Sequence, residues 1–158
     1  MNERISVLVL FGSESDRPTM EETSRVLGSF GVPHELAQVS AHRNPDRVRE
    51  LVTGAPSRGV RVLIAAAGMA NHLAGAAAAL TSLPVIGVPL GGSPLGGADA
   101  LLSTVQMPAG VPVATVAIGP AGAKNAAVLA VQILALADPV LAEKLVEMKR
   151  RLARGEKL

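Results

Sequence analysis

The sequence predicts an α/β fold: a flavodoxin-like, doubly wound three-layer sandwich with a five-stranded parallel sheet. Short β-branched apolar runs alternate with helical patterns along the chain, and this alternation is typical of a parallel sheet covered by helices. The 158 residues correspond to one domain. Because hydrophobic residues make up 49% and charged residues 18%, the chain has enough apolar material for a core and too few charges for a disordered protein.

Five apolar runs are the expected strands. They cover residues 5–11, 34–39, 60–65, 84–88 and 111–118. Helices are expected in the gaps between them. The first covers about residues 18–30, with Asp16 as a candidate cap and Gly31 at its end. The second begins at Asn44-Pro45, where a capping residue precedes a proline at the first helical position.

The later helical segments are unusually apolar and predict contacts between subunits. A third helix is expected near residues 70–81, and residues 126–137 are apolar on every side apart from Gln132. Such a helix needs neighbours all round, so we expect an oligomer. After Asp138-Pro139, a last helix over about residues 139–154 carries an apolar stripe that should dock on protein. The stripe consists of Leu141, Leu145, Met148 and Leu152.

Composition excludes several classes of function. The chain has two aromatic residues and no Cys, so we expect no base-stacking nucleic-acid module, no disulfide and no thiolate metal site. Residues 62–98 carry no Asp, Glu, Lys or Arg, but seven Gly and several polar residues interrupt them, which indicates buried structure rather than a membrane span. The N-terminal apolar run is too short for a secretory leader, and the lack of Cys fits a cytoplasmic location.

The high pI of about 9.5 is a property of the C-terminus. Residues 141–158 contain six Lys and Arg against three Asp and Glu, and the rest of the chain is almost neutral. Lys149, Arg150 and Arg151 have no aromatic residues between them, so the pattern indicates a solvated helix face rather than a nucleic-acid site.

Three polar clusters follow the first three expected strands. They are Gly12-Ser13-Glu14-Ser15-Asp16, Ser40-Ala41-His42-Arg43 and Gly68-Met69-Ala70-Asn71-His72. The carboxyl ends of parallel strands meet at one edge of a sheet, where ligands bind. A glycine turn before a helix presents N–H groups to an anion, and Arg43 adds a bidentate contact. The clusters together predict a phosphate pocket, although Ser13, Ser15 and Asp16 fit a helix cap equally well.

Two of the three histidines lie in these loops. An unperturbed imidazole titrates near pH 6.5, so His42 and His72 suit general acid–base catalysis, whereas His34 opens a strand and is expected to be structural. The glycine pattern of a dinucleotide-binding loop and the Gly-Lys-Ser/Thr of a Walker loop are both missing. No local carboxylate accompanies the loop histidines as a ligand set would require, so no metal is expected.

Several motifs, spread along nearly the whole chain, occur in the same order as in one known protein family. They are Gly12-Ser13-x-Ser15-Asp16, Ser40-Ala41-His42-Arg43-x-Pro45-Asp46, the glycine loop that ends in His72-Leu73, Pro84-Val85-Ile86-Gly87-Val88-Pro89, and Val105-Gln106-Met107-Pro108-x-Gly110-x-Pro112-Val113. In these motifs the sequence closely resembles the N5-carboxyaminoimidazole ribonucleotide mutases of bacterial purine biosynthesis. The resemblance implies an isomerase that moves a carboxyl group from the exocyclic nitrogen to ring carbon 4. The group moves by decarboxylation and recarboxylation in a closed site, without organic cofactor, metal or ATP.

The same resemblance implies roles for individual residues and an assembly. His42 matches the catalytic histidine that carries the proton. Ser13, Asp16 and Arg43 hold the ribose phosphate, and Ser15 and Ser40 line the pocket. The loop of Gly68, Met69, Ala70 and His72 covers the base and CO2. Family members assemble as homo-octamers, which implies that the single domain over residues 1–158 packs its helix of about residues 139–154 on a neighbouring subunit.

Two other functions stay open at this point. The family's usual loop reads glycine-glycine-alanine-alanine-histidine-leucine-proline-glycine, whereas this chain has Met69 and Asn71. With an asparagine at this position the loop resembles that of the aminoimidazole ribonucleotide carboxylases, which use free CO2. Arg43 and His72 favour the mutase. A nucleotide-binding module without chemistry is the third function, and the presence of His42 argues against it.

Overall fold

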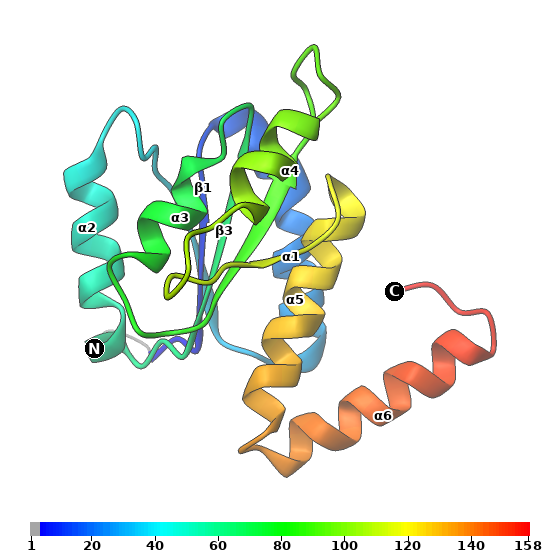
Figure 1. Ribbon diagram of the computed structural model, residues 1–158. Coiled ribbons are helices and arrows are strands. Elements are labelled where there is room, and N and C mark those ends of the chain that lie inside the picture. The colour runs from blue at the N-terminus through cyan, green and yellow to red at the C-terminus, as the bar shows by residue number, and fades with distance from the viewer. Residues whose placement is uncertain (1–3) are drawn as a thin grey trace.

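The computed structural model describes residues 4–158, and its parallel sheet has the strand order β2-β1-β3-β4-β5. Helices cover both faces of the sheet (Figure 1). The strands are β1 (Val7–Phe11), β2 (His34–Gln38), β3 (Val62–Gly68), β4 (Val85–Leu90) and β5 (Ala114–Thr115). The predicted fold class is therefore confirmed. The expectation about an N-terminal leader rests in part on residues 1–3, which lie outside the described residues.

Six α-helices connect and follow the strands in the described chain. They are α1 (Arg17–Phe30), α2 (Pro45–Gly54), α3 (His72–Ala78), α4 (Ala98–Val105), α5 (Pro120–Ala135) and α6 (Pro139–Ala153), and single 3-10 turns cover η1 (Glu14–Asp16) and η2 (Pro56–Arg58). Gly31 ends α1 with φ of 74°, as predicted. Asp16 and Asn44 occupy the N-cap positions of α1 and α2, but neither side chain makes a capping hydrogen bond. The sequence predicted the caps' positions and not their interactions.

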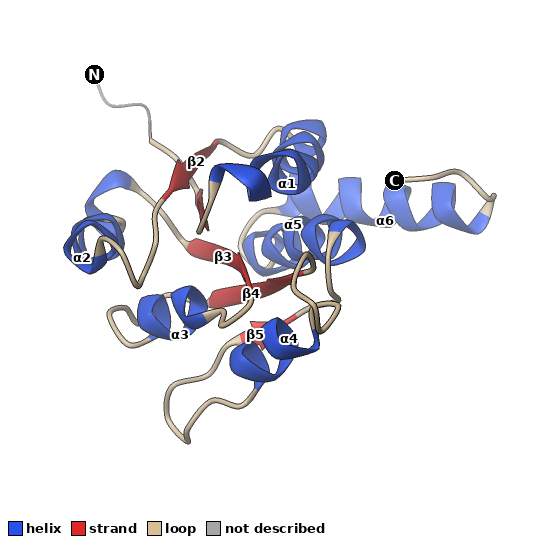
Figure 2. Cartoon of the chain, turned by 90° about the horizontal axis from the view of Figure 1, so that it is seen from above, coloured by secondary structure: helices blue, strands red, loops and turns tan. Residues whose placement is uncertain are grey.

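The side chains of β1 alternate between two hydrophobic layers, as a strand buried on both faces requires. Val7, Val9 and Phe11 pack in one cluster with α1, α5 and the start of α6. Leu8 and Leu10 pack in the other with α2 and α3. Figure 2 shows the sheet between these two helical layers. The three layers therefore follow directly from the period of two along the buried strand.

The fifth strand is much shorter than predicted. The expectation was residues 111–118, and the strand covers only Ala114–Thr115. Pro112 has no N–H to donate, and Gly110 turns the chain with φ of 92°, so the ladder starts late. Beyond the strand, Val116 N–H and Gly119 N–H still donate to the carbonyls of Gly87 and Pro89. The segment thus runs along β4 as an irregular edge.

The last helix packs on its own chain at its beginning and extends away from it at its end (Figure 1). Leu141 and Met148 are buried with α1 and α5, and the Lys144 ammonium donates to the Phe30 carbonyl at 2.7 Å. Leu152, the last member of the predicted stripe, is 39% exposed. The stripe therefore docks partly within the chain. Across residues 4–158, the structure contains no helix with the length and apolar character needed to cross a membrane.

We predict that Gly122→Ala destabilises the fold by more than about 2 kcal/mol, because there is no space for an added side chain. A Cβ at Gly122, in the first turn of α5, would lie 1.6 Å from the Ala117 carbonyl oxygen. Urea unfolding measures the change. As a matched control, Gly28→Ala lies inside α1 with nothing within 4 Å of its Cβ position, and should stabilise by about 0.5–1 kcal/mol. Equal unfolding free energies for the two variants would contradict the packing at Ala117.

Candidate active site

One cavity of about 500 Å³ lies at the carboxyl edge of the sheet. Its walls come from the loops that follow β1, β2, β3 and β4, where neighbouring strands leave a crevice on either side of β1. The lining residues are Gly12, Ser13, Ser15, Asp16, Ser40, Ala41, His42, Arg43, Ala67, Gly68, Met69, Ala70, Leu73, Gly91 and Gly92. The cavity is large enough for a small phosphorylated ligand.

The loop after β1 supplies hydroxyl groups and the first turn of a helix. The Ser13 and Ser15 hydroxyls lie 2.9 Å apart, and the Ser13 oxygen also accepts from the Ser15 N–H. Asp16 follows, with its N–H donating to the Ser13 carbonyl at 2.9 Å. This turn leads directly into α1, whose N-terminus carries a positive partial charge. Hydroxyl donors and the helix end thus face the same side of the cavity.

The carboxyl group of Asp16 is half-buried at this wall. Burial raises its pKa above the ordinary range, and a backbone hydrogen bond at Ser13 opposes that effect in part. A carboxylate that loses water in this way interacts more strongly with a ligand hydroxyl or a cation than an exposed carboxylate does. Asp16 is therefore suited to hold a hydroxyl-bearing ligand rather than only to cap a helix.

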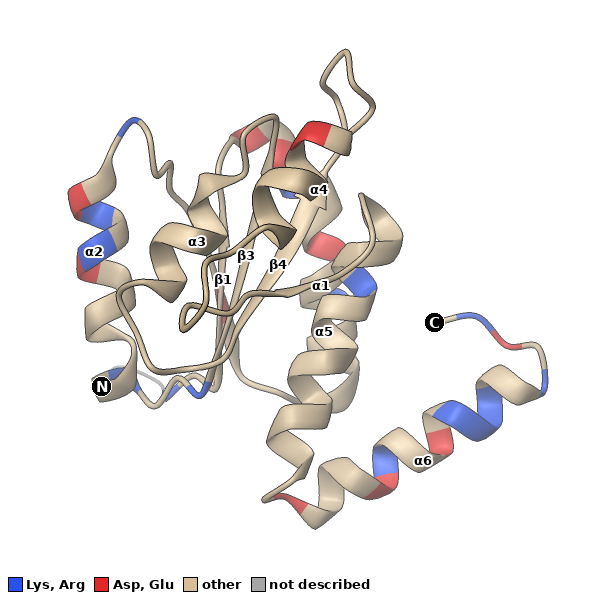
Figure 3. Ribbon diagram, viewed as in Figure 1, with Lys and Arg blue, Asp and Glu red and all other residues tan. Residues whose placement is uncertain are grey.

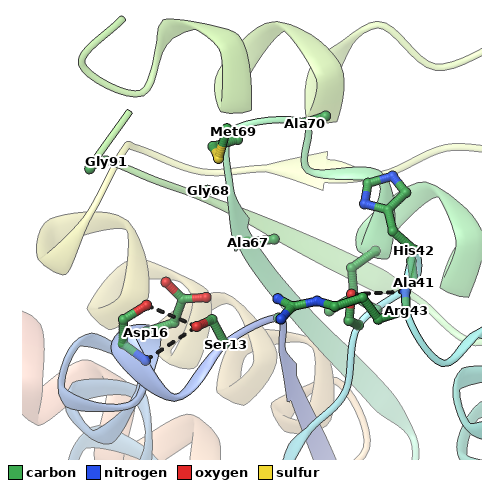
Figure 4. A pocket seen from close by; sticks show the side chains of 15 residues that line it. Ser13, Asp16, Ala41, His42, Arg43, Ala67, Gly68, Met69, Ala70 and Gly91 are labelled. Carbon is green, nitrogen blue, oxygen red and sulfur yellow. Dashed lines mark hydrogen bonds between the residues drawn. The ribbon is translucent and has the colours of Figure 1, made fainter. Parts of the chain in front are cut away.

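The loop after β2 is fixed by hydrogen bonds within itself. The Ser40 N–H donates to the Asn44 side-chain oxygen at 2.7 Å, and the Ser40 hydroxyl oxygen accepts from the Arg43 N–H at 3.2 Å. These bonds turn the loop so that Arg43 extends across the cavity toward Ser13 and Asp16 (Figure 4). A guanidinium facing a serine-lined helix start is a suitable binding site for a phosphate group.

His42 forms a direct pair with His72 from the start of α3. The His42 Nε2 and His72 Nδ1 atoms lie 2.7 Å apart, and the rings meet edge to face with centroids 4.8 Å apart. Such a bond needs one N–H donor and one free lone pair. A proton taken up by His42 is therefore shared with a second imidazole, whereas two charged rings would break the contact. The pair can carry one positive charge and pass one proton.

The loop after β3 covers the cavity opposite Ser13 and Asp16 (Figure 4). Gly68, Met69 and Ala70 line it. Met69 has φ of 55°, and no other non-glycine residue among residues 4–158 has a positive φ. This left-handed conformation is costly for a side-chain-bearing residue. The loop therefore needs interactions elsewhere to hold it.

The structure brings nearly all of the predicted site residues together. Nine of them line the cavity, and His72 contacts the site through His42 instead of lining it. Sequence reasoning missed Gly91 and Gly92, because the loop after β4 carries no charged residue next to them. The pair of glycines directly after a buried strand was the available signal. His34 bonds with Ser24 and the Val32 carbonyl, which fits the structural role expected for it.

Comparison with known proteins identifies the family. Residues 6–155 match the family model of AIR carboxylase. The N5-carboxyaminoimidazole ribonucleotide mutase of Pyrococcus horikoshii is 50% identical over 155 residues, which cover 96% of this chain and 86% of that protein. The mutase of Synechocystis sp. is 54% identical over 144 residues, or 91% of this chain and 81% of that protein.

A solved structure agrees with these relatives. The crystal structure of Treponema denticola PurE matches with a TM-score of 0.86 and 28% sequence identity, over 96% of this chain and 94% of that chain. The chain belongs to the AIR carboxylase family. The resemblance drawn from the serine, histidine and proline motifs is thereby confirmed.

We predict that Asp16→Asn makes the protein slightly more stable at pH 7, by well under about 1 kcal/mol, because solvent screens a carboxyl group that is only half-buried. A carboxyl group with a raised pKa binds more protons in the folded than in the unfolded state. Stability therefore falls as pH rises from the unfolded pKa through the folded one. Thermal unfolding of both proteins at pH 3 and pH 7 measures the effect, and the difference should vanish at the lower pH. The Glu14→Gln variant is the control, because Arg17 lowers the pKa of Glu14. Its stability change should have the opposite sign. A lower melting temperature for Asp16→Asn at pH 7 would contradict the burial argument.

Proposed function

We propose that this protein is an N5-carboxyaminoimidazole ribonucleotide mutase, an isomerase of purine biosynthesis that forms 4-carboxy-5-aminoimidazole ribonucleotide. The observation that carries the proposal is the His42–His72 pair, with Nε2 and Nδ1 2.7 Å apart, beside a cavity with serines and Arg43 on its other side. Relatives about half identical to this chain bear the mutase name. Family membership and the pocket chemistry thus support one reaction.

His42 carries the proton in both halves of the reaction. As the bond between the exocyclic nitrogen and the carboxyl carbon breaks, protonated His42 donates to that nitrogen, and CO2 leaves. Ring carbon 4 then attacks the same CO2, and its hydrogen returns to His42 as a proton. The histidine ends the cycle as it began, so atoms and charges balance. The hydrogen bond to His72 holds the His42 ring in one orientation during the cycle.

The remaining residues bind the substrate at its two ends. Arg43 and the Ser13 and Ser15 hydroxyls hold the phosphate, and Asp16 accepts from a ribose hydroxyl. Ser40 keeps the loop of His42 and Arg43 in place, since its oxygen already accepts from the Arg43 N–H. Binding energy from the ribose phosphate therefore positions the base next to His42.

The loop of Gly68, Met69 and Ala70 retains CO2 between the two steps. CO2 carries no charge, so its retention depends on a closed and dry site. The small apolar walls supplied by Ala67, Ala70 and Leu73 suit this requirement. Because the released CO2 stays next to carbon 4, proximity supplies much of the rate enhancement.

We further propose that residues 1–158 form a single domain that assembles as a homo-octamer in the cytoplasm, with α6 packing on a neighbouring subunit. Several large apolar side chains are exposed, among them Leu102 on α4, Val146 on α6 and Leu136 at 88%. The surface of α3 and most of α4 and α5 carries few charges (Figure 3). Apolar surface of this kind favours subunit contacts, and the lack of Cys fits a reducing compartment.

We predict that His42→Asn retains ribonucleotide binding and loses at least about 100-fold in kcat, because the proton carrier is gone while the phosphate contacts stay. Calorimetric binding and product formation measure the two effects. His34→Asn is the matched control, since His34 bonds with Ser24 outside the cavity and should leave kcat unchanged. Turnover by His42→Asn at the wild-type rate would remove His42 from its role.

For the assembly, we predict that sedimentation velocity finds a single species of eight chains. An added charge on the apolar face, Leu102→Asp, should shift the protein to smaller species because it leaves an unpaired charge in the contact. Glu50→Ala, on the exposed and charged face of α2, is the control. A stable monomer for the unmodified chain would contradict the proposed octamer.

A further inference from the structure

Asn71 is buried inside the active-site loop and bonds with two elements outside it. The residue has 0% exposure. Its N–H donates to the Ser103 hydroxyl of α4 at 2.9 Å. Its side-chain nitrogen donates to the Thr104 hydroxyl at 2.9 Å and to the Val88 carbonyl of β4 at 3.3 Å. The loop between β3 and α3 is thus attached to α4 and β4 through one residue.

The hydrogen bonds determine which way the amide of Asn71 points. The Val88 carbonyl can only accept, and the Thr104 hydroxyl uses its own proton on the Ala100 carbonyl at 2.6 Å. The amide nitrogen must therefore face both. The amide oxygen is buried without a partner among the described residues, which costs about 1–3 kcal/mol. A gain in the stability of the fold is therefore a poor explanation for an asparagine at this position. The path that its side chain imposes on the loop explains the residue better.

The residues on either side of Asn71 depend on that path. Two positions earlier, Met69 has φ of 55°, a conformation that surrounding contacts must maintain. The next residue, His72, makes the 2.7 Å bond with His42. Asn71 occupies the N-cap position of α3 but makes no capping bond with its side chain. The side chain is used for the attachment to α4 and β4 instead.

We propose that Asn71 is a positioning residue: by attaching the loop to Ser103, Thr104 and Val88 it holds His72 against His42 and keeps the loop closed over the released CO2. The inference rests on the proposed function. It gives α4, none of whose residues lines the cavity, a part in the reaction, since two of its hydroxyls fix the loop. A loop that moves away from the cavity would let CO2 leave before carbon 4 attacks it.

The test uses three variants of the full chain. Asn71→Ala removes the attachment, Thr104→Val removes the accepting hydroxyl at nearly constant volume, and Thr104→Ser keeps the hydroxyl. For the first two we expect kcat to fall about tenfold with KM nearly unchanged, because a small misplacement of reacting groups is costly. The uncarboxylated ribonucleotide released per product formed should rise severalfold. Thr104→Ser should match the wild type in both quantities.

A second measurement reports on the histidine pair without any substrate. The chain has three histidines, so the imidazole signals of His42 and His72 can be assigned by NMR after ring labelling. Asn71→Ala and Thr104→Val should shift the signals of both His42 and His72. Thr104→Ser should leave these two signals unchanged, and the distant His34 signal should stay the same in all three variants.

The outcomes separate this inference from the proposed function. A wild type that does not convert the N5-carboxylated substrate disproves the proposed function, and the NMR result then decides the inference alone. Wild-type turnover and release ratio in Asn71→Ala, or unshifted His42 and His72 signals, would overturn the inference. So would equal losses in Thr104→Val and Thr104→Ser, because the effect would then follow packing rather than the hydroxyl.

Discussion

The parallel register of strands β1 to β4 is the constraint on which the site depends. Phe11 at the end of β1 is level with Gln38 of β2 and Ala66 of β3, and Gly68 of β3 is level with Leu90 of β4. The four loops therefore leave the sheet within about two residues of one another, an offset of roughly 7 Å. Groups far apart in sequence, such as His42 and His72, meet because these strand ends are aligned. A shift of one residue would also turn each buried side chain to the opposite layer.

Small side chains determine the size of the cavity. Ala67 near the end of β3 and Gly91 after β4 leave room where larger residues would fill the crevice. Gly122 lets α5 start directly against the Ala117 carbonyl. The resulting site is polar on one side and apolar on the other. The polar side suits a ribose phosphate, and the apolar side, with the His42–His72 pair at its margin, suits CO2. The cavity thus offers two surfaces of opposite character, as the proposed reaction requires.

The sequence was sufficient for the fold class and for the three polar clusters, since hydrophobic period and strand-end position both follow from local residue patterns. The apolar run predicted a longer β5 than the structure has, because Pro112 and Gly110 reduce this run to an irregular edge along β4. Three features needed the structure. The His42–His72 bond depends on how two loops approach, Gly91 lacks a charged neighbour to mark it, and Asn71 points inward rather than toward the helix it precedes. The first and the last depend on tertiary contacts that no local pattern encodes, whereas the available signal for Gly91 was the glycine pair after a buried strand.

In the proposed reaction the carboxyl group comes from the substrate and stays in the site. The most direct test supplies the wild type with the N5-carboxylated ribonucleotide in buffer that contains labelled CO2, and separately with the uncarboxylated ribonucleotide and bicarbonate. We expect fast conversion of the first substrate with little label in the product, because in the proposed reaction the loop keeps CO2 beside carbon 4. Preferential use of the second substrate, with the label fully incorporated, would contradict it and assign the protein a carboxylase activity instead.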